Sequence, residues 1–461
     1  MGRFVLCHRS IAGKPAPTKR IAARALLAGA GVFFSAASAF AAIPVQHWTQ
    51  PSGAEVFFVA SPTIPMLDVQ LDFDAGNRRD PAAQAGLADV TALIAGKGVA
   101  ARGADPALDE NQLGEAWADL GASFGASAGE DRMSFQLRTL TEPALLAKAV
   151  QLAARELGEP AWPEDVWRRE RERISASIKE SRTRPGTIAA LAFDKAVFGS
   201  HPYGYETTPE SLARIQVADM KAVYAATIAP CRAKVSVVGA VTRAQADDIV
   251  TRLLARLPKP PDCAPLPAVP DVAPLTKAVD ERIAFESAQA HVLIGQPGFK
   301  RSDPDFFALV VGNHILGGGG FTSRLTEQVR EKRGLSYSVY SYFAPGLQAG
   351  AFTVGLQTRP DQAGEAVTVA RQVVREFVAK GPTEAELKAA KDNLIGGFAL
   401  RIDSNRKLLD NVANIAWNKL PLDYLDHWTE QVRRVSAADI RTAFQRVLQP
   451  DKMVTVVVGG R

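Results

Sequence analysis

The chain repeats one pattern of residues at a fixed distance of 220 positions. In each copy, an aspartate is followed by a proline and then by a glycine that ends an apolar run. The pairs are Asp219 and Asp439, Pro230 and Pro450, and Gly239 and Gly459. Each copy predicts a helix with an acidic first turn, a turn marked by proline, and a buried strand. Three landmarks at one ungapped distance favour duplication over chance, so we expect two similar halves.

A proline-rich stretch separates the two copies. Residues 259–270 contain too many prolines for a helix or a central strand, which is typical of a linker. A chain of this length also exceeds what one hydrophobic core usually serves. We therefore predict a first domain at 42–258, a linker at 259–275 and a second domain at 276–461. Alternating strands such as 69–73 and 351–356 mix with amphipathic helices, so each domain should be an α/β layer structure.

The first 41 residues have the features of an export signal. Basic residues extend to Arg24, an apolar run covers 25–34, and small residues end in Ala39-Phe40-Ala41. A single membrane anchor is the alternative, but the apolar run is short for a bilayer span. Without this segment the chain has 48 basic and 49 acidic residues, a net charge of −1. The basic character of the whole sequence therefore belongs to targeting and gives no argument for nucleic acid or for an anionic membrane.

The remaining cysteines, Cys231 and Cys263, leave two possibilities open. Cys7 lies in the predicted signal. An oxidising periplasm would allow the other two to form a disulfide, whereas two packed, unpaired thiols are the alternative.

Two motifs connect the sequence to a known family. One is His-Pro-Tyr-Gly at 201–204, and the other runs from Ser323 through Arg330 to Tyr337 and Ser338. Together with the export signal and the duplicated halves, these motifs resemble the smaller, two-domain bacterial members of the pitrilysin/insulinase zinc metallopeptidases. That family is related to the subunits of the mitochondrial processing peptidase. The resemblance covers essentially the whole mature chain and implies an α+β fold, with two homologous domains, largely antiparallel sheets and a clam-like arrangement.

The zinc motif of that family is degenerate in this chain. Active members carry His-x-x-Glu-His on the first helix, where two histidines bind Zn²⁺ and the glutamate polarises the bound water. The preceding Ala85-Gly86-Leu87-Ala88 is intact, but Asp89, Ala92 and Leu93 stand at the three functional positions. Leu87, Val90, Leu93 and Ile94 share one helix face, which predicts a packed core helix. We therefore expect no metal on this chain.

The position of the third zinc ligand in the family corresponds to Glu180. This residue lies in a helix crowded with charged residues, and such a helix is usually a solvated face. The histidines of the chain are scattered, with no pair at ligand spacing, and His201 has the sequence context of a turn residue.

Arg330 and Tyr337 are the residues to which the resemblance assigns a function. In the family, this pair faces the zinc from the second domain, and its hydrogen bonds hold the substrate backbone and the developing oxyanion. The alternative is that Arg330 is one more cation on a charged helix and that Tyr337 packs on a strand.

A run of glycines precedes this pair. It lacks the Gly-Lys-Ser/Thr ending of a phosphate loop, because Phe321-Thr322-Ser323 follows. The resemblance implies flexible backbone near the substrate channel, and the alternative is a long helix cap followed by a loop. The run consists of Gly317, Gly318, Gly319 and Gly320.

These features together predict the non-catalytic subunit of a periplasmic heterodimer. The partner would be a homologous subunit that binds the zinc, the substrate a peptide or an unfolded protein, and neither nucleic acid nor membrane would be bound after signal cleavage. One alternative is a purely structural or binding scaffold, against which the retained Arg330 and Tyr337 argue. The other is an autonomous zinc peptidase with unrecognised ligands, against which the absence of a donor cluster in the sequence argues.

The export signal predicts a defined mature N-terminus. Cleavage after Ala41 should leave a protein that begins at or near Ala42, because a signal peptidase cuts after small residues in an A-x-A pattern. N-terminal sequencing of the native protein measures this directly. An intact Met1 or Gly2 terminus in the membrane fraction would favour the anchor instead.

Overall fold

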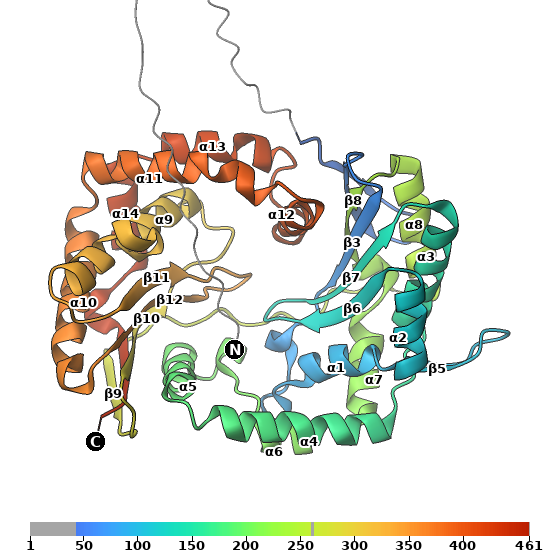
Figure 1. Ribbon diagram of the computed structural model, residues 1–461, viewed down its shortest axis with the longest axis horizontal. Helices are drawn as coiled ribbons and strands as arrows, with labels where there is room; N and C mark the ends of the chain where they lie inside the picture. The colour runs from blue at the N-terminus through green and yellow to red at the C-terminus, as the bar shows by residue number, and fades with distance from the viewer. Residues whose placement is uncertain (1–42, 260–261, 461) are drawn as a thin grey trace, which may run out of the picture. The chain divides into compact units, whose positions relative to one another are not determined.

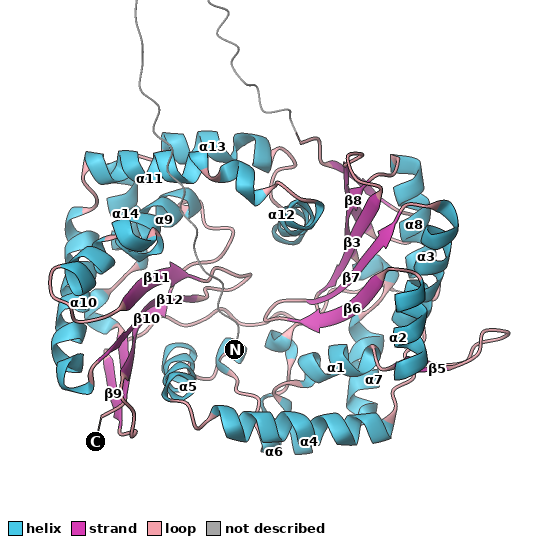
Figure 2. Ribbon diagram, in the orientation of Figure 1, coloured by secondary structure: helices cyan, strands magenta, loops and turns pink. Residues whose placement is uncertain are grey.

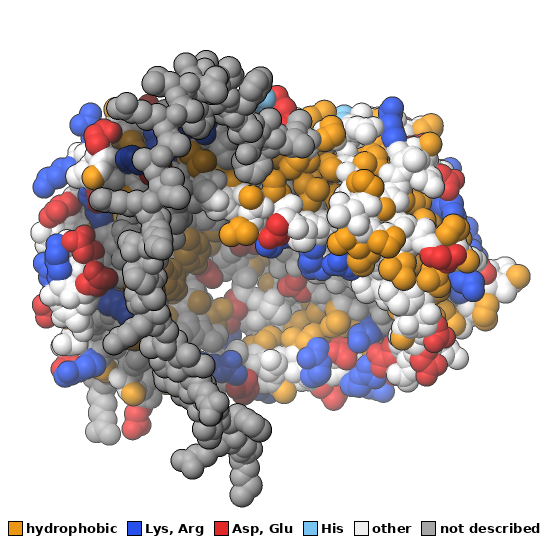
Figure 3. Space-filling view, turned by 45° about the horizontal axis from the view of Figure 1, so that its top comes forward, with side chains coloured by type: hydrophobic (Ala, Val, Ile, Leu, Met, Phe, Trp, Pro, Cys, Tyr) orange, Lys and Arg blue, Asp and Glu red, His pale blue; other side chains and the backbone are white. Residues whose placement is uncertain are grey.

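The computed structural model describes residues 43–259 and 262–460 (Figure 1). The predicted signal at 1–41 lies outside these residues, as do two positions of the predicted linker. Within the described part of the chain, no helix combines the length and the apolar character needed to cross a membrane. On the face drawn in Figure 3, Lys and Arg side chains lie near Asp and Glu side chains mainly toward the edges, and hydrophobic side chains gather over its upper right part.

The first half of the described chain builds a mixed sheet of six strands, in the order β1-β2-β8-β3-β7-β6. All neighbours are antiparallel except β2 and β8, which are parallel. Strands β4 and β5 form a separate small pair. The strands are β1 (Gln46–Thr49), β2 (Glu55–Ala60), β3 (Met66–Phe73), β4 (Gly98–Val99), β5 (Leu108–Asp109), β6 (Ser123–Ala128), β7 (Met133–Leu140) and β8 (Lys234–Gly239).

Helices cover one face of this sheet and extend beyond its edge (Figure 2). Helices α3 and α8 pack against each other over the apolar face formed by Leu67, Val69 and Leu71 of β3. The helices are α1 (Leu87–Ala95), α2 (Glu110–Asp119), α3 (Pro143–Gly158), α4 (Glu164–Ser181), α5 (Pro185–Phe198), α6 (Pro209–Ala213), α7 (Val217–Thr227) and α8 (Arg243–Leu254).

The second half repeats this architecture without a counterpart of β1. Its described sheet has five strands in the order β11-β12-β10-β13-β9, and only β13 and β9 are parallel. The strands are β9 (Val279–Ile283), β10 (Ala290–Pro297), β11 (Ser338–Phe343), β12 (Ala351–Thr358) and β13 (Val454–Val458). The helices are α9 (Phe306–Asn313), α10 (Ala363–Lys380), α11 (Glu384–Gly396), α12 (Asn405–Asn418), α13 (Tyr424–Arg434) and α14 (Ala437–Val447).

The duplication predicted from the sequence is confirmed element by element. Helices α5 and α12 begin and end 220 residues apart, and so do α7 and α14. In each half, the strand that follows the α7 or α14 position lies between one parallel and one antiparallel neighbour: β8 between β2 and β3, and β13 between β9 and β10. The predicted fold class of two homologous α/β layer units with largely antiparallel sheets is therefore confirmed. The predicted domain boundaries stay a prediction.

The two halves exchange one helix each. Helix α5 belongs to the first half in sequence but packs on β10 and β13 of the second sheet. Helix α12 belongs to the second half and packs on β2, β3 and β8 of the first sheet (Figure 1). Because each exchanged helix covers part of the other half's sheet, the two halves share buried surface over a wide area.

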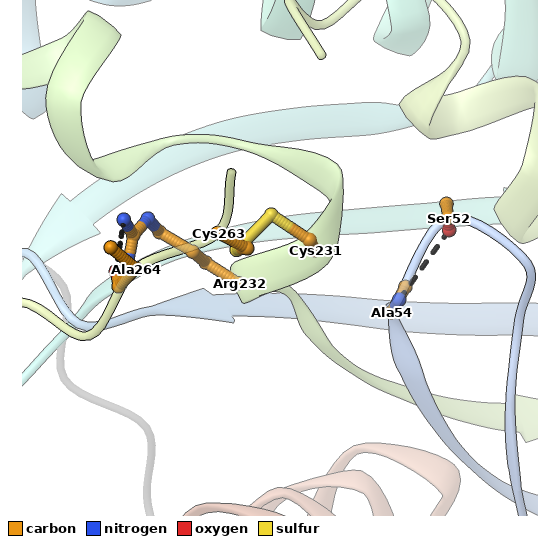
Figure 4. Close-up of a disulfide and its surroundings, with 6 residues drawn as sticks. All are labelled: Ser52, Ala54, Cys231, Arg232, Cys263 and Ala264. Carbon is orange, nitrogen blue, oxygen red and sulfur yellow. Dashed lines mark hydrogen bonds between the residues drawn. A yellow bond between two sulfur atoms is a disulfide. The ribbon is translucent and has the colours of Figure 1, made fainter. Parts of the chain in front are cut away.

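Cys231 and Cys263 are joined in a disulfide, which decides between the two possibilities left open by the sequence. The bond ties the segment after residue 261 to the turn that follows α7 (Figure 4). Arg232 strengthens the same connection, since its guanidinium donates to the carbonyl of Ala264 at 2.7 Å. The start of the predicted linker is therefore fixed to the first half.

The disulfide predicts that protein lacking residues 1–41 has no free thiols. Titration of thiols in denaturant without reductant should give none. Replacing both cysteines by serine should lower the free energy of unfolding by about 3 kcal/mol, because the bond closes a loop with a sequence separation of 32. Two reactive thiols per chain, or a double variant as stable as the oxidised protein, would contradict the bond.

Candidate functional site

Helix α1 carries the positions of the degenerate zinc motif, and specific backbone contacts fix where this helix begins. The helix begins after Gly86, whose φ of +97° favours glycine, and a Cβ there would lie 2.6 Å from the Thr207 side chain. The carboxylate of Asp80 accepts hydrogen bonds from the backbone N–H groups of Gly86 and Ala88, at 2.9 and 3.0 Å. These contacts fix the start of the helix. Only the side chains at the three functional positions therefore differ from the His-x-x-Glu-His motif.

The three motif positions offer no set of metal ligands. Ala92 is buried against the core of the first half, and Leu93 is half-buried beside Leu87, Val90 and Ile94. The predicted apolar helix face is thus confirmed.

Asp89, at the first histidine position, accepts a hydrogen bond from the Asn77 amide at 3.0 Å. Desolvation by its surroundings raises the pKa of Asp89, and the hydrogen bond from Asn77 opposes that rise. This carboxylate is the one donor group at the three positions.

Glu180 is engaged elsewhere. It lies near the end of α4, is exposed, and pairs with Arg184 at 2.5 Å. Among the described residues, no group of three or more His, Cys, Asp or Glu side chains is arranged to hold a metal ion. Since Ala92 and Leu93 also lack donor atoms, the residues at the motif do not fit a zinc ion.

Arg330 and Tyr337 lie together in the second half. Arg330 sits in a π-helical turn, Thr326–Glu331, and Tyr337 directly precedes β11. The guanidinium carbon of Arg330 lies over the Tyr337 ring, 4.9 Å from its centroid. The Tyr337 side chain is 82 % exposed, which contradicts the alternative that it packs on a strand. The structure therefore places the half-buried Arg330 beside an exposed phenol.

Arg330 differs from its charged neighbours in having no carboxylate partner within the described chain. Lys332 pairs with Glu327 at 2.7 Å, and Arg324 pairs with Glu386 at 2.5 Å. Arg333 donates to the backbone of Gln328 at 2.8 Å. The neighbouring cations thus serve the local structure, whereas the N–H groups of Arg330 are left to bind a ligand.

Arg324 anchors the whole segment to α11. Its Nε and Nη2 atoms donate to the Glu386 carboxylate at 2.5 and 2.7 Å, and the guanidinium carbon lies 5.0 Å from the centroid of the Phe377 ring. Although burial opposes the effect, hydrogen bonds from Arg324 and Thr383 lower the pKa of Glu386 to about 2. Glu386 therefore stays ionised at neutral pH, and the pair holds the turn before Arg330 in place.

The glycine run forms a turn with close contacts at several of its members, and the expected flexibility of its backbone stays a prediction. Its first two members end a π-helical turn, His314–Gly318. A Cβ on Gly317 would lie 2.4 Å from Ser341 Oγ in β11, and a Cβ on Gly319 would lie 2.6 Å from the His314 carbonyl. Gly320 has a φ of +63° and faces open space. Small residues are thus required here by close contact and by one left-handed turn.

The sequence reasoning missed Phe321, which directly follows this run. Its side chain is 70 % exposed, and the guanidinium of Arg330 lies 4.7 Å from the centroid of its ring. We call Phe321, Arg330 and Tyr337 the aryl–arginine cluster. An aromatic residue after four glycines was visible in the sequence, but its contact with Arg330 depends on the two π-helical turns, which no sequence pattern indicated.

His201 has a structural role, as its sequence context predicted. Its Nδ1 accepts the backbone N–H of Tyr203 at 3.1 Å, and its Nε2 lies 2.9 Å from the Pro270 carbonyl. The Tyr203 hydroxyl donates to Asp131 at 2.6 Å and accepts the N–H of Gln348 at 3.1 Å. The His-Pro-Tyr-Gly motif therefore joins the first half, the linker and the second half.

A pocket of about 360 Å³ lies between α5 and the second sheet. Tyr340 and Tyr342 of β11 stack on each other at its wall, with ring centroids 6.0 Å apart. Burial raises the pKa of Asp194, another lining residue, to about 6, and it lowers the pKa of His291. This pocket could not be found from the sequence, because it exists only through the exchange of α5.

Comparisons with known proteins agree with this architecture. A family model described as the peptidase M16 inactive domain matches residues 214–394. The crystal structure of a peptidase M16 inactive domain from Pseudomonas fluorescens is similar, with 34% sequence identity and a TM-score of 0.84. The similarity covers 90% of this chain and 98% of that chain.

Two curated relatives add further similarity. The non-peptidase homolog YmxG of Helicobacter pylori is 24% identical over 395 residues, which are 79% of this chain and 88% of that protein. An uncharacterized zinc protease of Streptomyces coelicolor is 32% identical over 179 residues, and this match spans 38% of each chain.

The similarity to the Pseudomonas fluorescens structure extends over nearly the full length of both chains and agrees with the duplicated architecture. The chain therefore belongs to peptidase family M16, the pitrilysin/insulinase family that its motifs resemble.

Proposed function

We propose that this chain is the non-catalytic subunit of a heterodimeric zinc metallopeptidase in the periplasm. It binds peptide or unfolded protein substrate together with a homologous partner subunit that holds the zinc. Arg330 and Tyr337 act on substrate bound at the partner's metal, and this chain alone hydrolyses nothing.

One contrast between the halves carries the proposal. In the first half, Ala92 and Leu93 remove donor atoms from the metal position and join the apolar cores. In the second half, Tyr337 keeps its phenol exposed, the half-buried Arg330 lies beside it, and no described carboxylate neutralises the guanidinium. Hydrogen-bond donors that are not used within the chain are expected to bind a ligand. Because this chain lacks the metal ligands, a second chain should supply the metal at which these donors act.

The chemistry of the pair fits the stabilisation of a developing oxyanion. A phenol O–H and a guanidinium N–H both donate hydrogen bonds, and such donors matter most when negative charge appears in the transition state. The guanidinium also presents its N–H donors in a planar fork, so it can hold a substrate carbonyl throughout the reaction. Neither group needs a metal on its own chain.

Two further observations support the proposal. A relative at 24% identity is named a non-peptidase homolog, and the similar Pseudomonas fluorescens structure is described as an inactive domain. The disulfide between Cys231 and Cys263 fits an oxidising compartment such as the periplasm. The competing function is a scaffold without a role in catalysis, which would leave the pair without a purpose.

The degenerate motif predicts that the purified mature chain binds far less than one zinc ion. Elemental analysis after dialysis measures this, with a zinc-bearing homologue as the positive control. The reason is that Asp89 alone cannot supply the three protein ligands of a catalytic zinc site. Stoichiometric zinc that survives dialysis would favour an autonomous peptidase.

The proposed role of Tyr337 predicts a loss of catalysis without a loss of assembly. In the native complex, purified through a tag on this chain, Tyr337→Phe should lower kcat and kcat/KM together by about a hundredfold, as for other oxyanion donors. Arg330→Ala should in addition raise KM, because it also weakens peptide binding. Cleavage of a quenched fluorescent peptide gives the rates, and size-exclusion chromatography gives assembly.

Tyr342→Phe is the matched control, since it removes the same hydroxyl from an exposed tyrosine outside the proposed pair. It should assemble normally and cleave at the wild-type rate. If Tyr337→Phe behaves in the same way as this control, the pair does not act in catalysis, and the scaffold function becomes the better account.

A further inference from the structure

We propose that Phe321 is a positioning residue that holds the Arg330 guanidinium in its working orientation. The inference rests on the proposed function of Arg330, and it adds a residue with no polar group to the site. Phe321 acts through Arg330 and does not itself bind the substrate.

The contact geometry is the first reason. The guanidinium carbon of Arg330 lies 4.7 Å from the Phe321 ring centroid and 4.9 Å from the Tyr337 ring centroid. A guanidinium packed on aromatic faces keeps its N–H groups at its edge, where they remain free to donate. The rings therefore limit the rotation of the side chain without occupying its donors.

The second reason is that nothing else in the described chain fixes this cation. Arg324, six residues earlier, is held by a two-point ion pair with Glu386, whereas Arg330 has no described carboxylate partner. A carboxylate would fix the guanidinium equally well but would compete with the substrate for the same N–H groups. Aromatic contacts avoid this competition, because they restrain the guanidinium and leave its N–H groups and its positive charge available to the substrate.

The third reason is that Phe321 has no role in the cores. The side chain is 70 % exposed and belongs to none of the buried clusters of the described residues. Its backbone lies in a short 3-10 turn, Gly320–Thr322, which is closed by a hydrogen bond from Ser323 N–H to the Gly320 carbonyl at 3.1 Å. A hydrogen-bonded turn that displays a phenyl ring to solvent is explained by the contact with Arg330.

The geometry is tested in this chain without any partner. In wild-type protein, ring currents from Phe321 and Tyr337 should shift the Arg330 side-chain resonances, and Arg330→Lys assigns the Nε–Hε signal by deleting it. Phe321→Leu should move this signal toward its ordinary position, and Phe321→Tyr should retain the shift. An Nε–Hε signal unaffected by Phe321→Leu would overturn the proposed contact.

The function is tested in the native complex with the quenched fluorescent peptide. Phe321→Leu should lower kcat/KM about two- to fivefold, which corresponds to the loss of one exposed cation–π contact, and Phe321→Tyr should restore it. In an Arg330→Ala background, Phe321→Leu should cause no further loss, because its effect passes through Arg330. Ile64→Ala, at another exposed apolar side chain, is the control for nonspecific effects.

The outcomes separate this inference from the proposed function. If Tyr337→Phe and Arg330→Ala impair cleavage but Phe321→Leu does not, the positioning role is wrong and the proposed function stands. If Phe321→Leu costs as much in the Arg330→Ala background as in wild type, Phe321 contacts the substrate itself and the inference is wrong. If none of the three variants affects cleavage, the proposed function fails as well, even where the resonance shift confirms the contact.

Discussion

The packing of α5 on the second sheet is the contact on which the rest of the structure depends. Ala189, Phe193 and Val197 of this helix are buried against Val454 and Val456 of β13. The fit is close, because a Cβ on Gly295 of β10 would lie 2.8 Å from the Phe193 ring. Without α5, this apolar sheet face would be open to water, and the cost would grow with the exposed area. Neither half therefore buries its own surface alone, and the duplicated chain folds as one unit.

The interface between the other exchanged helix, α12, and the first sheet has a different chemical character. The face of the sheet on this side carries buried polar side chains, among them Asp72, which accepts hydrogen bonds from Arg132 and Ser134. Lys234 donates to the carbonyl of Ala416 in α12 at 2.8 Å. Burial raises the pKa of Asp72, and Arg132 opposes the rise, so the charge is tolerated through its partners. The interface of α5 with the second sheet thus buries apolar side chains, whereas the interface of α12 with the first sheet requires a defined set of polar contacts.

The sequence predicted the features that depend on local or periodic patterns. The repeat distance located α7 and α14 with their following strands, and the apolar spacing of Leu87, Val90 and Ile94 gave the buried face of α1. The exchange of α5 and α12 was not predictable, because the apolar face of a helix shows that the helix packs on a sheet but does not show on which sheet. The π-helical turn that ends in the glycine run was missed, since glycines permit many backbone paths and only tertiary packing selects one. The other π-helical turn, Thr326–Glu331, and the contact of Phe321 had no sequence pattern that indicated them.

The loss of metal ligands in α1 leaves the aryl–arginine cluster intact, because separate contacts hold the two regions. The apolar residues of α1 pack in the cores of the first half. The turn that carries Arg330 is held by the ion pair of Arg324 with Glu386 and by the contact of Gly317 with β11. No contact that fixes either region is shared with the other. Apolar side chains at positions 92 and 93 are therefore compatible with an unchanged arrangement of Arg330, because the contacts that hold the two regions are independent.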